Sequence, residues 1–267
     1  MTGVVFTHTL RRNWRQIVYW GFGLGLLAWY IMAIIPNVEM LEQMMRLLET
    51  MPPALMAAFG SPDIAALTTP DGFMGFAYFT YTGLLMSVWA LVAGLNVTAV
   101  EEDRGIMDML LSTPISRTQL ILEKLFAYGV ALLAIIAVSF VCLLIGTTFS
   151  LPMDMGKLLA GSLNMIPASL TVLGFSAMVG ALVRSRSTAL VLAVVFVVAS
   201  YFIDFIGNAA SGSAVAALRA VSYYSYYGGS QFASTGIVPG NVLLLTVAGV
   251  VLCAISVVLF RRRDIGL

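Results

Sequence analysis

Six runs of apolar residues, each long enough to cross a lipid bilayer, constrain this chain more than any other feature of its sequence. The hydrocarbon core of a bilayer is about 30 Å thick, so a helix needs roughly 20 apolar residues to cross it. The runs occupy residues 17–35, 73–100, 125–149, 158–183, 188–206 and 242–260. Only 10% of the residues are charged, against about 25% in soluble domains. The sequence predicts an all-α, polytopic membrane protein in which residues 1–267 form a single transmembrane domain with six transmembrane helices.

The N-terminal pattern combines the basic residues Arg11, Arg12 and Arg15 with the first apolar run. That run is longer than the apolar region of a secretory signal, and no small-residue cleavage site follows it. We therefore expect an uncleaved first span. Residues 1–16 mix apolar with basic side chains, which predicts an interfacial helix along the inner membrane face, with a disordered tail as the alternative.

Basic residues are distributed unevenly about the six runs. Lys and Arg near the ends of spans are retained in the cytoplasm. With the N-terminus inside, three of the 14 basic residues lie outside: Arg46, Lys157 and Arg219. The inner ones are Arg11, Arg12, Arg15, Arg104, Arg117, Lys124, Arg184, Arg186, Arg261, Arg262 and Arg263. This bias predicts a multi-pass protein of the plasma membrane, or of a cell's inner membrane, with both termini in the cytoplasm.

Two segments, 36–72 and 207–241, are then extracytoplasmic. The first carries apolar residues at helical spacing, up to Pro52 and Pro53, which predicts a helix at the outer interface. The second contains the sequence YYSYYGG at residues 223–229. Because Tyr commonly lies at the headgroup level, this sequence fits an aromatic anchor and a short half-inserted hairpin equally well.

The spans contain almost no ionisable side chains. Asp204 is the exception, and its place near the outer end of the fifth run favours a carboxylate that faces a loop or the interface over a buried functional one. A transporter driven by an ion gradient usually carries ionisable groups inside its bundle. No filter-like or charge-ring sequence indicates a channel. Any solute transport would have to draw its energy from another molecule.

The chain also lacks a catalytic or nucleotide-binding motif of its own. The only Gly-Lys pair, Gly156-Lys157, is followed by Leu158, so no phosphate-binding loop is present. The single histidine, His8, cannot supply paired metal or haem ligands, and no triad or carboxylate pair has an enclosing pocket. No long basic block suggests nucleic-acid binding. We expect no enzyme activity, no bound cofactor, no metal site and no nucleic-acid partner.

Charge is concentrated between the second and third runs, in the sequence EEDRGIMDMLLSTPISRTQLILEKL, residues 101–125. Gly105 allows a bend, and the apolar residues after it predict a short helix outside the membrane, which Pro114 ends. Ser116 followed by Gln119 is a capping-box pattern that predicts a new helix running into the third span. The apolar tip of such a protrusion requires either a partner protein or packing against the membrane and the inner helix ends.

This segment resembles the cytoplasmic loop of type-2 ABC exporter permeases, in which an acidic pair and a Gly precede Leu-Leu-Ser-x-Pro-[IV]-Ser-Arg and a later Lys. The matching residues are Glu101, Glu102, Gly105, Leu110, Leu111, Ser112, Pro114, Ser116, Arg117 and Lys124. The sequences MPPALMAAFG, TPDGFMGFAYF and RRRDIG are similar to the outer segment, second-span entry and C-terminus of the same permeases. Ile106 and Met109 depart from the Thr and Leu that are common in the family.

The resemblance implies a coupling helix, within the cytoplasmic loop 101–124, that seats in a separate ATP-binding subunit. Two such subunits would bind ATP and Mg and drive the spans between inward-facing and outward-facing states. The residues expected to meet that subunit are Glu101, Glu102, Arg104, Gly105, Ile106, Met109, Leu110, Leu111, Pro114 and Arg117. The function implied is the permease subunit of an ATP-driven exporter. The alternatives are a non-transporting membrane anchor for a cytoplasmic partner and a gated channel.

Six spans are half the usual complement of such a transporter, so a second permease, identical or paralogous, is expected. The resemblance implies that the second and fifth spans line the substrate path. Polar side chains available in the second span are Tyr78, Tyr81, Thr82, Ser87 and Asn96. They suit contact with a substrate and ordinary helix packing in lipid equally well. The glycines at 21, 23 and 25 are interpreted as a close helix contact rather than a site.

Overall fold

The computed structural model describes seven stretches of the chain. They are residues 3–34, 69–98, 116–149, 152–183, 185–210, 214–229 and 236–262, together with isolated positions between residues 39 and 52. The predicted outer helix before Pro53 and the predicted coupling helix lie outside these stretches.

Six helices are long and apolar enough to cross a membrane, which confirms the number predicted from the sequence. They are α1 (Val4–Ile34), a composite helix from Pro70 to Leu95, α9 (Arg117–Thr147), α10 (Met155–Leu182), α11 (Arg186–Ala209) and α14 (Pro239–Arg262). The composite helix consists of α5 (Pro70–Met74), the π-helical turn η1 (Gly75–Phe79) and α6 (Thr80–Leu95). Most of the helix ends lie within five residues of the ends of an apolar run; α1 and α9 begin earlier, α9 at Arg117 where the Ser116 cap predicted a helix start.

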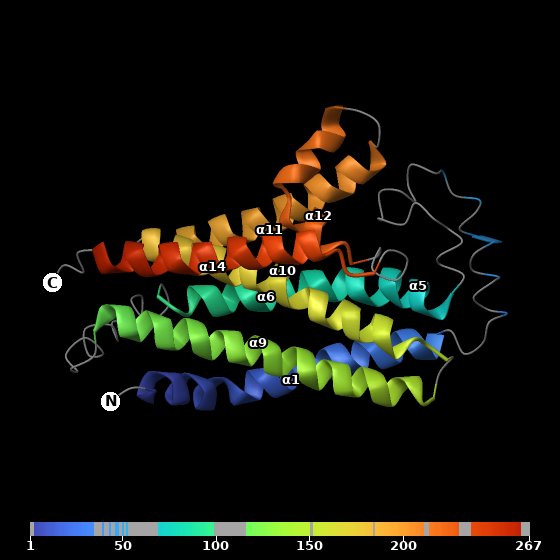
Figure 1. Cartoon of the computed structure of the whole chain (residues 1–267), viewed down its shortest axis with the longest axis horizontal. Coiled ribbons are helices and arrows are strands. Elements are labelled where there is room, and N and C mark those ends of the chain that lie inside the picture. Colours follow the sequence, from blue (N-terminus) through green and yellow to red (C-terminus); the bar gives the residue numbers. More distant parts are fainter. Residues whose placement is uncertain are drawn as a thin grey trace.

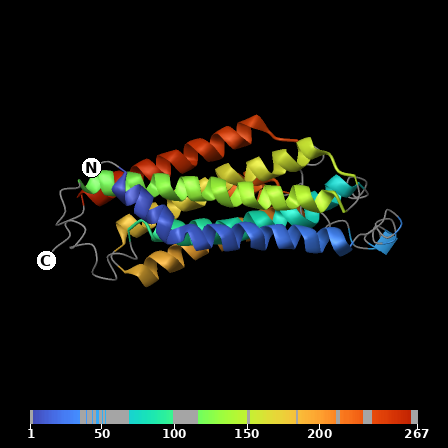
Figure 2. The same ribbon diagram turned by 90° about the horizontal axis from the view of Figure 1, so that it is seen from below.

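The first helix begins before the first apolar run. The sequence predicted an interfacial helix over residues 1–16 followed by the first span, and α1 runs through both without interruption, from Val4 to Ile34. Figure 2 shows that its first turns run at an angle to the rest of the helix. Arginine has good helix propensity and leaves the backbone hydrogen bonds intact. The change from the mixed sequence of residues 1–16 to the apolar run therefore does not end the helix.

The helices run lengthwise as a bundle (Figure 1). The start of α1 and the end of α14 lie at the same end of the bundle, as an even number of spans requires (Figure 1). We call this the termini end and the opposite one the far end. The most extensive contacts join α1 to α9, α10 to α14 and α10 to α6. Helices α1 and α9 therefore form one group, and α6, α10 and α14 form a larger group in which α10 contacts both of the others.

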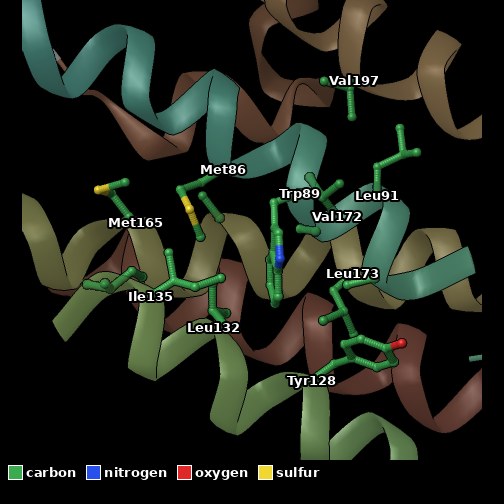
Figure 3. Packing of buried hydrophobic residues seen from close by; sticks show 14 of the residues in the cluster. Met86, Trp89, Leu91, Tyr128, Leu132, Ile135, Met165, Val172, Leu173 and Val197 are labelled. Atoms are coloured by element: carbon green, nitrogen blue, oxygen red, sulfur yellow. The ribbon is translucent and has the colours of Figure 1, made fainter. Parts of the chain in front are cut away.

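Side chains from several helices form one core at the middle of the bundle. The residues in it that Figure 3 labels are Met86, Trp89 and Leu91 of α6, Tyr128, Leu132 and Ile135 of α9, Met165, Val172 and Leu173 of α10, and Val197 of α11. All are almost fully buried. Since lipid is itself apolar, van der Waals packing rather than water exclusion holds such a core together.

Small residues allow the closest helix contacts. A Cβ atom added at Gly174 of α10 would lie 2.6 Å from the carbonyl oxygen of Gly249 in α14. In α1, added Cβ atoms would meet Val138 at 2.7 Å from Gly21 and Cys142 at 2.3 Å from Gly25. The spacing of Gly21 and Gly25 is the small-xxx-small pattern of membrane helix pairs. The predicted packing role is confirmed for these two residues, whereas Gly23 faces open space.

The segment between α11 and α14 folds back onto the bundle. It contains a 3₁₀ helix, η2 (Ala214–Val221), followed by α12 (Tyr223–Tyr227). Helix η2 packs on α11, and α12 packs against α10, α11 and α14. Tyr223, Tyr224 and Tyr227 are buried, so these side chains pack inside the bundle rather than forming an exposed anchor.

Candidate functional site

Two tyrosine hydroxyls of α12 bond to backbone carbonyls at the start of α6. The hydroxyl of Tyr227 donates to the carbonyl of Phe79 at 2.7 Å, and that of Tyr224 donates to the carbonyl of Thr80. Both tyrosine side chains are buried. A buried hydroxyl without a partner costs more than a typical hydrogen bond gains, so these two bonds fix where α12 can rest.

The acceptor carbonyls lie where the second span departs from regular helix. Phe79 ends the π-helical turn η1 and Thr80 begins α6. A π turn changes the hydrogen-bond ladder from i→i+4 to i→i+5, and such turns occur often at functional sites. The irregular backbone of the second span is thus the surface on which α12 rests.

Two glycines make room for the ring of Tyr227. A Cβ atom at Gly83 would lie 2.2 Å from Cε1 of that ring, and one at Gly229 would lie 2.6 Å from the same atom. The Gly229 Cβ would also come within 3.1 Å of the Phe79 carbonyl oxygen. Any side chain at either position would push the ring out of its place.

Helix α12 is also fixed by its own ends. Ser222 accepts a hydrogen bond from the Tyr224 amide at 3.2 Å and donates to the carbonyl of Ser200 in α11 at 2.6 Å. Gly228 ends the helix with φ of 58°, a left-handed conformation that favours glycine. A Ser at the N-cap and a Gly after the last turn are therefore the local reasons why these five residues form a helix.

The third partner of α12 is α10. Asn164 of α10 donates through Nδ2 to the carbonyl of Tyr227 at 2.5 Å. Asn164 follows Met155, the first residue of α10, by nine positions, so at 1.5 Å per residue the contact lies about 14 Å below the far end of α10. The α12 segment thus enters the bundle rather than covering its end.

A row of stacked aromatic rings also joins α12 to α11 and α10. Phe175 of α10 stacks on Phe196 of α11 with ring centroids 3.9 Å apart, and Phe196 stacks on Tyr223 at 5.4 Å. The Tyr223 hydroxyl then donates to Ser87 Oγ in α6 at 2.9 Å. We call the three tyrosines 223, 224 and 227, together with their acceptors Ser87, Thr80 and Phe79 on the second span, the tyrosine seat.

Asp204 is paired with a residue of the segment that follows α11. It accepts hydrogen bonds from Arg219 Nε at 3.0 Å and from Asn208 Nδ2 at 3.2 Å, and its side chain is 14% exposed. The carboxylate is therefore mostly buried, and it is paired with a residue of η2, which belongs to the predicted outer segment 207–241. Arg219 was interpreted only as an outer basic residue, since nothing in the local sequence links positions 15 apart on two elements. In the described part of the chain, no three His, Cys, Asp or Glu are grouped as metal ligands.

The five polar residues proposed for the substrate path occupy three different environments. Tyr78, Thr82 and Ser87 are buried and bond within the chain, Tyr78 to Ser139 Oγ at 2.9 Å and Thr82 to the Tyr78 carbonyl at 2.9 Å. Asn96 caps the C-terminus of α6 and is half-buried. Tyr81 alone is exposed, at 41%. The single chain therefore favours a packing role for the three buried residues.

Tyr81 belongs to an exposed stripe along α6. Its other members, at helical spacing, are Leu85, Val88 and Val92. Leu85 borders an open groove of about 300 Å³ whose other wall is α1, through Tyr19, Trp20, Gly23 and Leu24. Among the described residues, these four side chains form the exposed face of α6 over this length.

At the termini end, most of the predicted coupling residues lie outside the described stretches. They are Glu101, Glu102, Arg104, Gly105, Ile106, Met109, Leu110, Leu111 and Pro114; Arg117 is the first residue of α9. Ser116 accepts a hydrogen bond from the Gln119 amide at 3.2 Å, so the predicted helix start is confirmed. The Gln119 side chain bonds to Glu123 at 2.9 Å, one turn farther along.

Lys124 is almost completely buried beside the end of α6. Its ammonium donates to the carbonyl of Val97 at 3.1 Å, in the turn that follows α6. The neighbouring Thr98 hydroxyl is buried and has no hydrogen-bond partner within the part of the chain that the structure describes. A buried ammonium requires hydrogen bonds to offset its lost hydration, so Lys124 holds the start of α9 against the end of α6.

Glu123, which precedes the predicted span 125–149, holds the start of α1. Its carboxylate accepts the backbone amides of Gly3 at 2.9 Å, Val5 at 3.0 Å and Phe6 at 3.2 Å. These bonds, chiefly that from Gly3, together with the bond from Gln119, lower the pKa of Glu123 below its ordinary value. Adjacent residues of α9 thus contact two other helices, Glu123 the start of α1 and Lys124 the end of α6.

A comparison with known protein families identifies the family to which this chain belongs. Residues 5–265 match the family model described as ABC-2 family transporter protein. The chain therefore belongs to the ABC-2 family of transporter membrane proteins, whose members are membrane subunits without catalytic domains and generally pair with ATP-binding subunits. A search of curated proteins gave no match.

Proposed function

We propose that this chain is the permease subunit of an ATP-driven exporter, which forms a substrate pathway with a second permease and couples to two separate ATP-binding subunits. Family membership supports the partnership with ATP-binding subunits. The sequence contains no phosphate-binding loop, so ATP and Mg would be held by those partners. The termini end would face the cytoplasm, as the distribution of Lys and Arg predicts.

The observation that carries the proposal is the uncovered stripe of α6. Leu85 faces the groove toward α1, and α11 also packs on α6, so α6 lies next to both of these helices in its own chain. A twofold axis parallel to the bundle would place the stripes of two permeases opposite each other. The pathway would then run between the two copies, with α1 and α11 at its sides.

The chemistry of this face indicates the class of cargo. Tyr81 supplies one phenol, whereas Leu85, Val88 and Val92 are apolar. The stripe contains no charged side chain. Such a lining suits hydrophobic or amphipathic molecules, for example drugs, lipids or lipopeptides, better than ions or free amino acids.

The tyrosine seat would close this pathway near its outer end. It ties α6 to α12, and Asn164 ties α12 to α10. Tyr78, Thr82 and Ser87 contribute to this region by fastening the second span rather than by touching cargo. Release of cargo to the outside would then require α12 and α6 to move together or to separate.

A photo-crosslinking experiment in native membranes tests the stripe. A benzophenone amino acid replaces Leu85 or Val88, and the matched control replaces Val250, an exposed residue of α14. We expect the α6 positions to crosslink to a second permease, either the same chain or a six-span relative identified by mass spectrometry, and Val250 to label lipid. Equal permease crosslinking from Val250, or none from α6, would contradict the proposal.

A further inference from the structure

Helices α1 and α9 are fastened to each other along their whole length. In the middle, the glycines at 21 and 25 let the two backbones approach closely. Toward the far end, the indole Nε1 of Trp29 donates to the carbonyl of Cys142 at 2.5 Å. Toward the termini end, Asn13 donates to the Tyr128 hydroxyl at 3.4 Å. Tight packing and polar bonds at several levels make the two helices one rigid body. We call α1 together with α9 the arm.

The start of α1 is held to α9 by a single carboxylate. The first amides of a helix have no partner within the helix. The amides of Val5 and Phe6 in α1, and that of Gly3 just before it, all donate to Glu123. The negative charge also complements the positive end of the helix dipole. The Phe6 ring packs on Phe126, with centroids 5.6 Å apart, one turn beyond Glu123.

The arm is joined less tightly to the rest of the bundle. The larger group, α6, α10 and α14, has its own close contacts, including Gly174 against Gly249. Helix α9 does pack on α10 and α14 and contributes to the shared core, but these contacts are less extensive than those between α1 and α9. The polar contacts across this boundary include Lys124 with the Val97 carbonyl just after α6, and Tyr78 of η1 with Ser139. Between α1 and α6 lies the open groove of about 300 Å³ rather than a packed interface. A boundary of this kind permits one packed body to slide past another.

We propose that α1 and α9 move as one arm relative to α6, α10 and α14, and that Glu123 is the positioning residue that makes the first turns of α1 follow α9. The inference rests on the proposed function, because coupling to ATP supplies the driving force. The chain segment that joins α6 to α9 links the two bodies at the termini end, so a push on α9 is transmitted to α1 through Glu123. Movement of the arm then changes the width of the groove between α1 and Leu85 of α6. Leu85 belongs to the stripe that lines the proposed pathway, so the width of the pathway changes as well.

The clasp at Glu123 is tested on the permease alone, in lipid nanodiscs, by hydrogen exchange of the amides of residues 3–6. In Glu123→Gln we expect these amides to exchange about tenfold faster than in the unsubstituted protein. The matched control, Gln119→Leu, removes one neutral bond to the same carboxylate and leaves the three amide bonds, so its exchange should change much less. Gel filtration confirms that both variants remain folded. Unchanged exchange in Glu123→Gln would overturn the clasp without any reference to ATP.

The motion is tested on the complex with its copurified ATP-binding subunit, using pairs of spin labels in a Cys142→Ala, Cys253→Ala background. Labels at positions 22 and 122 report within the arm, and labels at 122 and 182 report from the arm to α10; all three residues are exposed. With a non-hydrolysable ATP analogue and Mg²⁺, we expect the second distance to shift by several ångströms and the first to stay constant.

Each outcome of the spin-label measurement decides a different claim. Equal shifts within the arm and between arm and α10 would overturn the rigid arm. If neither distance changes on addition of the nucleotide in a complex that hydrolyses ATP, the driven motion fails while the proposed function stands. If no ATP-binding subunit copurifies, the proposed function fails. The hydrogen-exchange result would still decide the clasp by itself. In Glu123→Gln the distance within the arm should broaden, whereas Gln119→Leu should retain the narrow distribution.

Discussion

The ring of Tyr227 occupies the space that a side chain at Gly83 would fill. A Cβ atom at residue 83 would lie 2.2 Å from Cε1 of Tyr227, closer than any real contact. The two residues are far apart in the sequence, and their fit determines whether α12 can rest on α6. The tyrosine seat therefore depends on the absence of a side chain at residue 83 as much as on the hydrogen bonds of the tyrosine hydroxyl groups.

Replacement of Gly83 should unseat α12. Gly83→Ala forces the Tyr227 ring to shift, and overpacking of this kind costs about 1–3 kcal/mol. Thermal unfolding of the purified protein in detergent should show a lower midpoint. Gly129→Ala in α9 is the matched control, because a Cβ there meets nothing within 4 Å, and its midpoint should be unchanged or slightly higher. Equal midpoints for the two variants would contradict the seat.

Removal of the Tyr227 hydroxyl should weaken the same contact without changing its shape. Tyr227→Phe leaves the Phe79 carbonyl without its hydroxyl donor from α12, with an expected loss of about 1 kcal/mol. Tyr30→Phe, on an exposed ring of α1, provides the control. If both substitutions have the same effect on the unfolding midpoint, the hydroxyl bond contributes nothing to the seat.

Substitutions of Lys124 should separate the effect of charge from the effect of packing. Lys124→Met removes the bond to Val97 and also the cost of burying an ammonium, so stability should change by no more than about 1.5 kcal/mol. Lys124→Glu instead places a carboxylate next to a carbonyl oxygen, and we expect a loss of about 3–5 kcal/mol. Chemical unfolding of both variants measures the difference, and a milder effect from Glu than from Met would refute this placement of the ammonium.

The pair of Asp204 and Arg219 should show non-additive stability changes. Each single substitution, Asp204→Asn or Arg219→Met, leaves one half-buried charge without its partner. The double variant leaves neither, so a double-mutant cycle should give a coupling free energy of about 1 kcal/mol. Additive effects within error would indicate that the 3.0 Å contact carries no net stabilisation.

Features set by local sequence were predictable. Runs of about 20 apolar residues located all six spans, because the bilayer imposes a length on every crossing helix. The Ser116 cap fixed the start of α9, since a side-chain oxygen three residues before an amide acts locally. The spacing of Gly21 and Gly25 indicated close packing for the same reason. The helix expected over residues 1–16 joins the first span without a break, because nothing between them interrupts the backbone hydrogen-bond ladder.

The parts of the candidate site that could not be predicted depend on partners distant in the sequence. Tyr227 bonds to Phe79 across 148 positions, and Glu123 bonds to Gly3 across 120. Hydropathy carries no information about such pairs, so Tyr223 to Tyr227 fitted an anchor and a hairpin equally well. Polarity alone also placed Tyr78, Thr82 and Ser87 with Tyr81, although only Tyr81 remains exposed.

The measurement that tests the central claim most directly is ATP hydrolysis by the affinity-purified complex in mild detergent. We predict that the chain copurifies with an ATP-binding subunit and that the assembled complex hydrolyses ATP. The combined substitutions Leu110→Asp and Leu111→Asp, in the proposed anchor of the coupling helix, should abolish assembly or its ATPase activity, while exposed Leu122→Asp on α9 should preserve both. Purification without any ATPase, or full activity in the double leucine variant, would contradict the account.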